Sequence, residues 1–341
     1  MSEASTTTFM RRETDEAAEV VARLLEREGR AIADLGARLR MMPPAAIVTS
    51  ARGSSDHAAS YLKYAVEISL GLPVASIGPS VASVYGAQLR LPGGVVFSVS
   101  QSGQSPDILA LQANARRGGA LAVALLNRTD SPLAEGADIV IPLHAGEEKS
   151  VAATKSFVAS VAAAAAITAV WTGDEALECA VRDLPAAILR SARMDWTPAL
   201  ERLVTARSLF TVGRGPAFAI ALEAALKCKE TAGLHAEAFS AAEVAHGPMQ
   251  IVGPDVPILA FVPADAAEAS SLAALERLRA FGGAVFAVGE GHDLPSAATG
   301  HGLTDSIPMI VAFYVMAEAL ARRRGYDPDR PAKLRKVTET L

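Results

Sequence analysis

The chain has 341 residues, which is long enough for two lobes that each bury a core. Half of the residues are hydrophobic and 20% are charged, proportions typical of packed globular proteins rather than of disordered chains. The 32 basic and 37 acidic residues give a net charge of −5, which argues against nucleic-acid or membrane partners, so an anionic ligand would need a local site.

The cysteines and the N-terminus exclude further classes of protein. Cys179 and Cys228 lie far apart and form no CxxC pair, so we predict neither a disulfide framework nor a metal site. The first residues lack the apolar segment of a signal peptide, and we therefore expect a cytoplasmic location. The longest apolar run, Phe157–Thr172, is rich in alanine and shorter than the ~20 residues that span a bilayer, so it predicts a buried core helix.

The first half of the chain alternates between helical and strand-like patterns. An amphipathic pattern from Val20 to Leu35 predicts a helix. Apolar runs predict strands, and two of them lead into a small polar loop and then a helical pattern. The expected strands are Ala45–Thr49, Val95–Val99, Leu121–Leu126 and Ile139–Pro142, and the helical patterns lie around Tyr61–Ile68 and Ile108–Ala115.

The second half repeats this order after a connecting helix and linker that we predict over Asp183–Asp195. The expected strands are Leu209–Val212, Ile258–Val262 and Val285–Val288, and the expected helices are Ala217–Ala232 and Ile310–Ala321. We therefore predict an α/β fold of two doubly wound parallel sheets flanked by helices, with ligands at the carboxyl ends of the strands. The expected division is a helical segment 1–34, a first lobe 35–180, a second lobe 198–331 and a tail 332–341.

Two loops in the first half carry anion-binding chemistry. Residues 100–105 read Ser-Gln-Ser-Gly-Gln-Ser between a strand and a helix, where backbone N–H groups and side-chain hydroxyls can hold a phosphate without lysine. An ordinary serine-rich turn with a helix cap is the alternative. The loop that contains Arg52, Gly53, Ser54 and Ser55 stands in the equivalent place after the preceding strand and could add donors. No GxxxxGK[ST] motif is present, which excludes a nucleoside triphosphatase loop.

The expected helix 217–232 carries Glu223, Lys227 and Glu230 at spacings that place them on one face. A solvated ion pair is the alternative, but the surrounding alanine and leucine predict a helix that is covered on most sides. A carboxylate in a partly dry place has its pKa raised toward the range useful for proton transfer.

Two further motifs, the turn that carries His246 and the Gly-Arg-Gly at 213–215, also have simpler interpretations. His246 precedes Gly-Pro and so lies on a turn, from which its side chain can reach a cleft, although a lone histidine is more often structural. The spacing of the nearby histidines and glutamates matches no compact metal pattern. Gly213-Arg214-Gly215 lacks the third glycine of a dinucleotide-binding motif, because Phe218 occupies that position, so we expect no nicotinamide cofactor.

Together these stretches resemble the sugar isomerase (SIS) domain family, in particular the isomerase half of glucosamine-6-phosphate synthase and, more closely, stand-alone SIS-type deaminases. The resemblance runs over almost the whole chain. Its motifs are MRRE at 10–13, SQSGQS at 100–105, VAATK at 151–155, GRGPAFAIALEAALKCKE at 213–230, HAEAFSAAEVAHGP at 235–248 and LRKVT at 334–338.

The resemblance implies roles for individual residues. Glu230 matches the glutamate that moves a proton between sugar C1 and C2, and Lys227 matches a lysine beside it. His246 matches a histidine that assists ring opening in the neighbouring subunit of a homodimer, and Lys336 matches a tail lysine associated with the open-chain sugar. The residues that match phosphate-binding and sugar-pocket positions are Ser55, Ser100, Gln101, Ser102, Ser105, Val151 and Ala153.

The sequence departs from the synthase pattern in several places. It carries no glutaminase half and begins Met-Ser rather than with a nucleophilic cysteine, so we expect it not to draw ammonia from glutamine. Arg52 stands where the synthase has cysteine, and Ala245 replaces a lysine. The tail has one residue fewer between Lys336 and the Val-Thr pair, a form that looks more like that of the deaminases.

The expected reaction is hydrolysis of glucosamine 6-phosphate to fructose 6-phosphate and ammonia, with no cofactor, because the sugar carbonyl stabilises its own carbanion. One alternative is isomerisation or deamination of another phosphosugar, such as galactosamine 6-phosphate. A sugar-phosphate sensor without catalysis is a second alternative, although the first 40-odd residues lack the helix-turn-helix pattern that such a sensor would use to bind DNA.

Overall fold

The computed structural model describes residues 7–336, and its first half forms one lobe with a parallel sheet. In chain order its elements are α1 (Phe9–Asp15), α2 (Ala17–Met41), β1 (Ile47–Ser50), α3 (Ser54–Leu70), β2 (Val74–Ser76), α4 (Ser80–Ser83), β3 (Val95–Ser100), α5 (Pro106–Arg117), β4 (Leu121–Leu126), α6 (Pro132–Glu135), β5 (Ile139–Pro142) and α7 (Lys155–Thr172). The strand order is β2-β1-β3-β4-β5, and every pairing is parallel.

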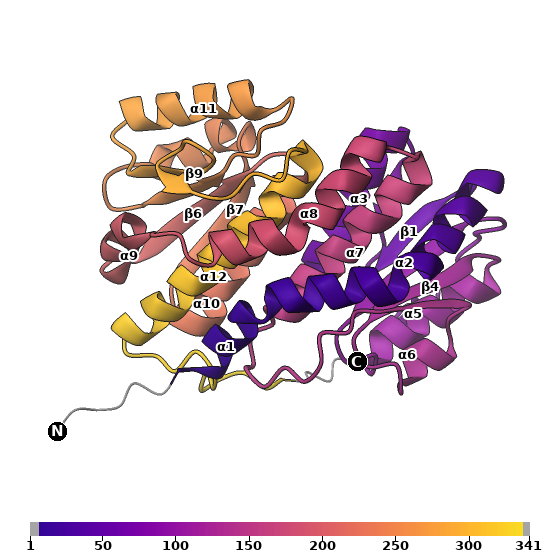
Figure 1. Ribbon diagram of the computed structural model, residues 1–341. Coiled ribbons are helices and arrows are strands. Elements are labelled where there is room, and N and C mark those ends of the chain that lie inside the picture. The colour runs from indigo at the N-terminus through magenta and orange to yellow at the C-terminus, as the bar shows by residue number, and fades with distance from the viewer. Residues whose placement is uncertain (1–6, 337–341) are drawn as a thin grey trace.

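The second lobe repeats this arrangement and lies beside the first (Figure 1). Its elements are α8 (Glu175–Ser191), α9 (Thr197–Val204), β6 (Ser208–Gly213), α10 (Pro216–Ala232), β7 (His235–Ser240), the 3-10 helices η1 (Glu243–His246) and η2 (Pro248–Ile251), β8 (Ile258–Phe261), α11 (Glu268–Ala280), β9 (Val285–Gly289), β10 (Leu294–Pro295) and α12 (Gly302–Arg323). The strand order is β10-β9-β8-β6-β7, again with parallel pairings throughout.

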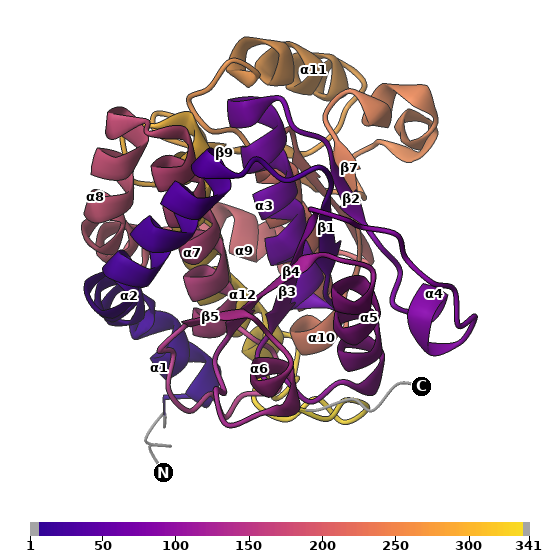
Figure 2. The same cartoon turned by 90° about the vertical axis from the view of Figure 1, so that its right-hand side faces the viewer.

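The helices on the inner faces of the two sheets join the lobes. α2, α3 and α7 contact the first sheet from one side, and α10 and α12 contact the second. α3 packs directly on α10, and α12 packs on α7 and α8, so the main hydrophobic core is continuous through both lobes. Figure 2 shows α3, α7 and α12 side by side in this central layer. Helices α5 and α11 cover the outer faces of the two sheets.

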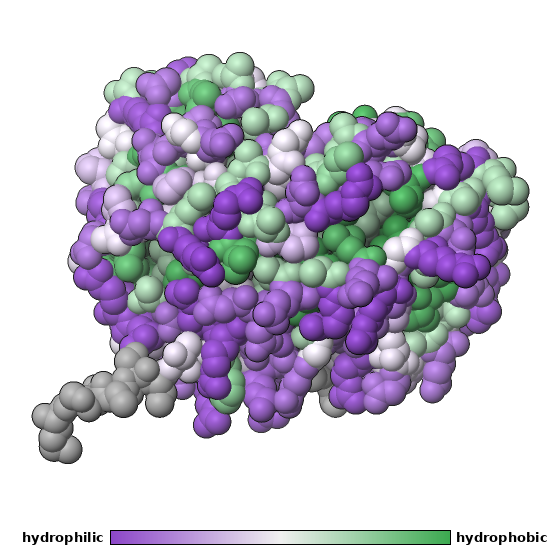
Figure 3. All heavy atoms as spheres, in the orientation of Figure 1, coloured by the Kyte–Doolittle hydropathy of each residue, from purple (hydrophilic) through white to green (hydrophobic). Residues whose placement is uncertain are grey.

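Two helices, Lys155–Thr172 and Gly302–Arg323, are long and apolar enough to cross a membrane by length and composition. Both are core helices here, since 89% of each apolar window is buried inside the protein. Hydrophilic residues cover most of the face drawn in Figure 3, and hydrophobic residues form separate small patches there. The interpretation of the apolar run Phe157–Thr172 as a buried helix is therefore confirmed.

A glycine caps the helix that follows the first strand of each lobe. Gly53 is the N-cap of α3 with φ 56° and ψ −134°, and Gly215 is the N-cap of α10 with φ 58° and ψ −134°. A side chain with a Cβ rarely adopts this backbone conformation. The Gly-Arg-Gly at 213–215 is thus the second copy of a strand–turn–helix corner, which explains why it resembles part of a nucleotide-binding motif.

The predicted fold class is confirmed, and the bounds of β4 and β5 agree with the prediction. The helix expected over 183–195 begins earlier, at Glu175, and the boundary expected between residues 34 and 35 falls inside the continuous helix α2. Several elements were missed: the strands β2, β7 and β10 and the helices α1, α4, α6, α9, α11, η1 and η2. Strands β2, β7 and β10 are short or carry exposed polar residues at the sheet edges, so they show no apolar run.

Candidate active site

A pocket of about 340 Å³ opens where β1 and β3 end and where α10 of the second lobe approaches. This is the carboxyl edge of a parallel sheet, the usual place for ligands in such folds. The predicted site residues that line it are Arg52, Gly53, Ser55, Ser100, Gln101, Ser102, Ser105, Val151, Glu230 and Lys336. The pocket thus brings together segments that lie far apart in the sequence.

The loop 100–105 forms the hydroxyl-rich wall of the pocket. Ser100 is the last residue of β3, and Ser105 is the N-cap residue of α5. The N–H of Gly103 donates to the Ser100 hydroxyl at 3.0 Å, which holds the loop in a tight turn. The side chains of Gln101, Ser102 and Ser105 are partly exposed at the start of a helix, where an anion is stabilised by the positive end of the helix dipole.

Arg52 stands at the rim of the pocket. Its Nε donates to the buried Asp107 carboxylate at 2.9 Å, and 52% of its side chain is exposed. The ion pair ties the corner that begins α3 to the first turn of α5, so it aligns the two polar loops. Because Asp107 offsets part of its charge, the guanidinium adds less attraction for an anion than an unpaired arginine at this place.

A buried cluster of charged groups lies behind Glu230. The Lys227 ammonium is hydrogen bonded to the Glu230 carboxylate and lies 3.3 Å from the Glu223 carboxylate. It also donates to the Ser54 hydroxyl of the first lobe at 3.0 Å. Lys227 and Glu223 are fully buried, whereas 22% of the Glu230 side chain is exposed toward the pocket. The three side chains therefore share one face of α10 as expected, and this face is buried except at Glu230.

The charged forms of Glu223 and Lys227 stabilise each other inside the protein. Burial by itself raises the pKa of Glu223, but the Lys227 ammonium and a hydrogen bond with His57 outweigh it, so the pKa lies below the ordinary value. Burial disfavours the ammonium of Lys227, yet the carboxylates of Glu223 and Glu230 hold its pKa above the ordinary value. Lys227 is thus a fixed positive charge next to Glu230.

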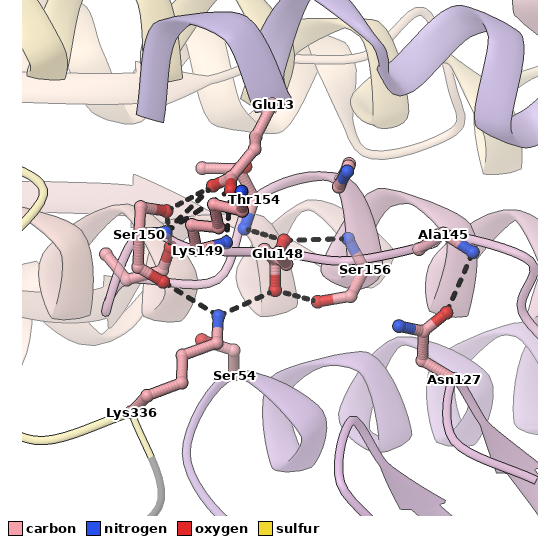
Figure 4. Close-up of polar contacts among 12 residues, drawn as sticks. Glu13, Ser54, Asn127, Ala145, Glu148, Lys149, Ser150, Thr154, Ser156 and Lys336 are labelled. Carbon is pink, nitrogen blue, oxygen red and sulfur yellow. Dashed lines mark hydrogen bonds and ion pairs between the residues drawn. The ribbon is translucent and has the colours of Figure 1, made fainter. Parts of the chain in front are cut away.

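The tail lysine Lys336 also lines the pocket and points toward Glu148 and Ser150 in the loop before α7 (Figure 4). Lys336 Nζ donates to Glu148 Oε2 at 3.0 Å and to the Ser150 carbonyl oxygen at 2.8 Å. Burial raises the pKa of Glu148, but Lys336 and donors from Thr154 and Ser156 outweigh it, so the net pKa is lowered. Glu148 also accepts from the N–H groups of Thr154 and Ser156, which begin α7.

The loop that carries Glu148 is fixed from both ends of the chain. The buried Glu13 carboxylate of α1 accepts from the N–H groups of Lys149 and Ser150. Asp329, shortly before the tail, accepts from the first N–H groups of α1 and its own carbonyl accepts from Val151 N–H at 3.2 Å. On the other flank, Asn127 accepts from Ala145 N–H at 2.8 Å, as Figure 4 shows.

Some predicted residues lie outside the lining of this pocket. Ser54 and Lys227 bond to each other behind it, and Ala153 is half-buried beside Val151. His246 is an exposed residue at the end of η1 in the second lobe and does not line the pocket of its own chain. The Val-Thr pair of the LRKVT motif lies outside the described residues. Within residues 7–336, no group of His, Cys, Asp and Glu is placed to hold a metal ion.

Sequence reasoning missed three partners of the site: His57, Glu148 and Tyr314. His57 lies three residues after Ser54 on α3, so helical spacing from the polar loop was a usable signal. Glu148 precedes α7 in a loop, where an acidic residue near a helix start is a weaker signal. Tyr314 lies in an apolar helix, and nothing in its sequence neighbourhood marks its contact with Glu223.

Comparison with known proteins places this geometry in a family. The sequence profile of the SIS domain matches residues 43–170 and 202–316, one stretch in each lobe. Glutamine–fructose-6-phosphate aminotransferase (isomerizing) of Halobacterium salinarum is 33% identical over 309 residues, which cover 83% of this chain and 50% of that protein. The chain spans about half the length of the curated relatives it matches.

Solved structures match over nearly the whole chain. A candidate phosphosugar isomerase of Silicibacter pomeroyi DSS-3 is 48% identical with a TM-score of 0.90, covering 95% of this chain and 100% of that one. A glucosamine-6-phosphate deaminase of Thermotoga maritima has a TM-score of 0.81 and covers 98% of this chain, with 100% of its own chain matched. At 20% identity, the second likeness shows the fold alone.

Proposed function

This chain belongs to the SIS domain family, and on that premise we propose that it hydrolyses glucosamine 6-phosphate to fructose 6-phosphate and ammonia. The observation that carries the proposal is the meeting of Glu230, the hydroxyl loop 100–105 and Lys336 in one pocket. The fold that the chain shares with the Thermotoga maritima deaminase is compatible with this reaction.

The phosphate of the substrate binds the loop 100–105 and Ser55 at the start of the two helices, where hydroxyl and backbone donors converge. This end of the sugar does not react, so its binding energy is available to orient the other end. The reacting carbons C1 and C2 then face Glu230, the one carboxylate of the buried cluster that lines the pocket.

The chemistry begins with the open-chain amino aldehyde, whose formation His246 of a second copy of the chain assists. Glu230 removes the proton from C2, the C1 carbonyl takes up the electron pair, and an enolamine forms. Return of a proton to C1 gives an imine at C2. Water then adds to C2, the C–N bond breaks, and ammonia leaves fructose 6-phosphate behind. Atoms balance with water as the only co-reactant.

Plain aldose–ketose isomerisation of a phosphosugar is the second candidate, favoured by the 48% identity to the candidate isomerase of Silicibacter pomeroyi. It uses the same base and needs no hydrolysis. Purified protein incubated with glucosamine 6-phosphate, galactosamine 6-phosphate and fructose 6-phosphate separates the two. We expect ammonia from the first at the highest rate. Interconversion of fructose 6-phosphate with an aldose phosphate, without ammonia from either amino sugar, contradicts the proposal.

A homodimer is part of the proposal, because His246 is exposed and does not line the pocket of its own chain. A symmetric dimer that seats η1 of each copy against the pocket of the other completes both sites. A cytoplasmic location remains a prediction.

A further inference from the structure

We propose that His57, on the first lobe, is a positioning residue for Glu230. Its hydrogen bond holds the Glu223 carboxylate, and Glu223 in turn holds the Lys227 ammonium in the position from which it bonds Glu230. This inference rests on the proposed role of Glu230 as the base. It assigns a function to a side chain that neither lines the pocket nor belongs to the acid–base pair itself.

The contact between the lobes is direct. His57 Nδ1 lies 2.9 Å from Glu223 Oε2, and the side chains are 16% and 0% exposed. The other oxygen of Glu223 accepts from the Tyr314 hydroxyl at 3.1 Å and lies 3.3 Å from Lys227 Nζ. His57 comes from α3, Glu223 and Lys227 from α10, and Tyr314 from α12, so the carboxylate is fixed from three helices.

Glu223 depends on this donor because it is sealed from water. A buried carboxylate needs hydrogen bonds to both oxygens to remain charged and fixed in one orientation. Without the imidazole, Oε2 loses its 2.9 Å partner, and the side chain can turn about its remaining contacts with Tyr314 and Lys227 or take up a proton. Either change weakens the hold of Glu223 on the Lys227 ammonium.

A displacement of the Lys227 ammonium also displaces the Glu230 carboxylate in the pocket. Its ammonium bonds Ser54 at 3.0 Å and also bonds Glu230, which alone of this cluster reaches the pocket. Lys227 therefore fixes the position of the carboxylate that has to reach C2. Misplacing a reacting group by about 1 Å costs up to ~10²-fold in rate, so a small movement is enough.

The surroundings of His57 set the form in which it acts. The charged groups next to it are Asp56 on its own helix and Glu223 on α10, and the same Glu223 carboxylate contacts Lys227 on α10 and Tyr314 on α12. α7 also packs on α3, and its one charged residue, Lys155, pairs with Glu16. Since Glu223 is a carboxylate, the Nδ1 of His57 carries a hydrogen in either charge state. What matters is therefore the donor, and asparagine can supply one at that position.

The experiment compares His57→Ala, His57→Asn and a control, His292→Asn. His292 has the same 16% side-chain exposure and lies 3.7 Å from Glu268, away from the pocket. We expect His57→Ala to lower kcat of ammonia release at least about tenfold, with KM for glucosamine 6-phosphate within about twofold, because the phosphate site is separate. His57→Asn should recover kcat to within about threefold of the wild type, and His292→Asn should match it.

A second readout separates this inference from the identity of the reaction. Exchange of the C1 hydrogen of fructose 6-phosphate in D2O reports proton transfer by Glu230 even if the wild type releases no ammonia. The inference is overturned if His57→Ala exchanges the C1 hydrogen at the wild-type rate. It is also overturned if His57→Asn exchanges it as slowly as His57→Ala does. If His57→Ala does not fold, His57→Gln replaces it, because its amide lies at the Nε2 position and misses Glu223. A wild type without ammonia release or exchange overturns both proposals.

Discussion

The ammonium group of Lys227 lies 3.0 Å from the hydroxyl oxygen of Ser54, so the helix that carries Glu230 in the second lobe bonds directly to the substrate loop of the first. The ion pair of Arg52 with Asp107 adds a second tie between the loops that surround the pocket. The site therefore exists only when both lobes are packed together. Substitutions in one lobe should change the chemistry of residues in the other.

The two glycine N-caps, Gly53 and Gly215, allow a matched test of where the substrate phosphate binds. Gly53→Ala and Gly215→Ala place a Cβ at nearly the same φ and ψ, and each should lower the free energy of unfolding by about 1–3 kcal/mol. The added Cβ meets nothing within 4 Å at Gly53 and makes an ordinary 3.7 Å contact with Ile68 Cδ1 at Gly215. Only Gly53 lines the pocket. Gly53→Ala alone should weaken fructose 6-phosphate binding, measured by titration calorimetry. Equal binding by the two variants contradicts the placement of the phosphate.

Mixing of inactive variants tests the contribution of His246 across a dimer. Glu230→Gln and His246→Asn should each be nearly inactive alone. After mixing and subunit exchange, about a quarter of wild-type activity should return, because half of the dimers are mixed and each has one intact site. Ammonia release before and after exchange gives the answer. If the mixture stays as inactive as its components, His246 serves its own chain, and if His246→Asn alone is fully active, His246 serves no site.

We predict that substitution of Lys336, but not of the nearby Lys333, loosens the C-terminal tail and lowers activity. Lys336→Met removes the bonds to Glu148 and the Ser150 carbonyl, whereas Lys333→Met changes an exposed side chain in the same segment. Lys336→Met should lose about 1–3 kcal/mol of tail docking, seen as faster chymotryptic cleavage near Leu334, together with a lower kcat. Similar cleavage and activity of the two variants argues against a docked tail.

We predict that Glu148 makes the free energy of unfolding depend on pH in the acid range. Its pKa in the folded protein lies below the ordinary value of 4.5, so its stabilising contribution is present above pH 4.5 and is lost as pH falls through the pKa of the folded state. Glu148→Gln should therefore be clearly less stable than the wild type at pH 7, with a gap that narrows below about pH 4. Urea unfolding at several pH values measures the gap. A constant gap shows that Glu148 is not the group responsible.

The sequence was sufficient for the fold class and for most of the pocket. Apolar strands followed by small polar loops indicated where ligands bind, because parallel strands place their carboxyl ends on one edge. Helical spacing brought Glu223, Lys227 and Glu230 onto one face, as observed. The resemblance to the SIS domain family added Val151 and Lys336, which no local pattern marks as neighbours of the loop 100–105.

The rest depended on tertiary contacts that leave no trace in local spacing. The pairing of His57 with Glu223 spans 166 positions, and that of Lys336 with Glu148 spans 188. The position of Ser54 behind the pocket rather than in its lining depends on where α10 approaches α3. Such contacts follow from the packing of the lobes, which sequence periodicity alone does not determine.

The most direct measurement is the release of ammonia and fructose 6-phosphate from glucosamine 6-phosphate by the wild type and by Glu230→Gln. The account predicts equal molar amounts of the two products from the wild type. It predicts a loss of at least about a hundredfold in the variant, which still binds the substrate, because the general base is gone while the phosphate site is intact. Full turnover by Glu230→Gln, or a wild type that releases neither product, would contradict it.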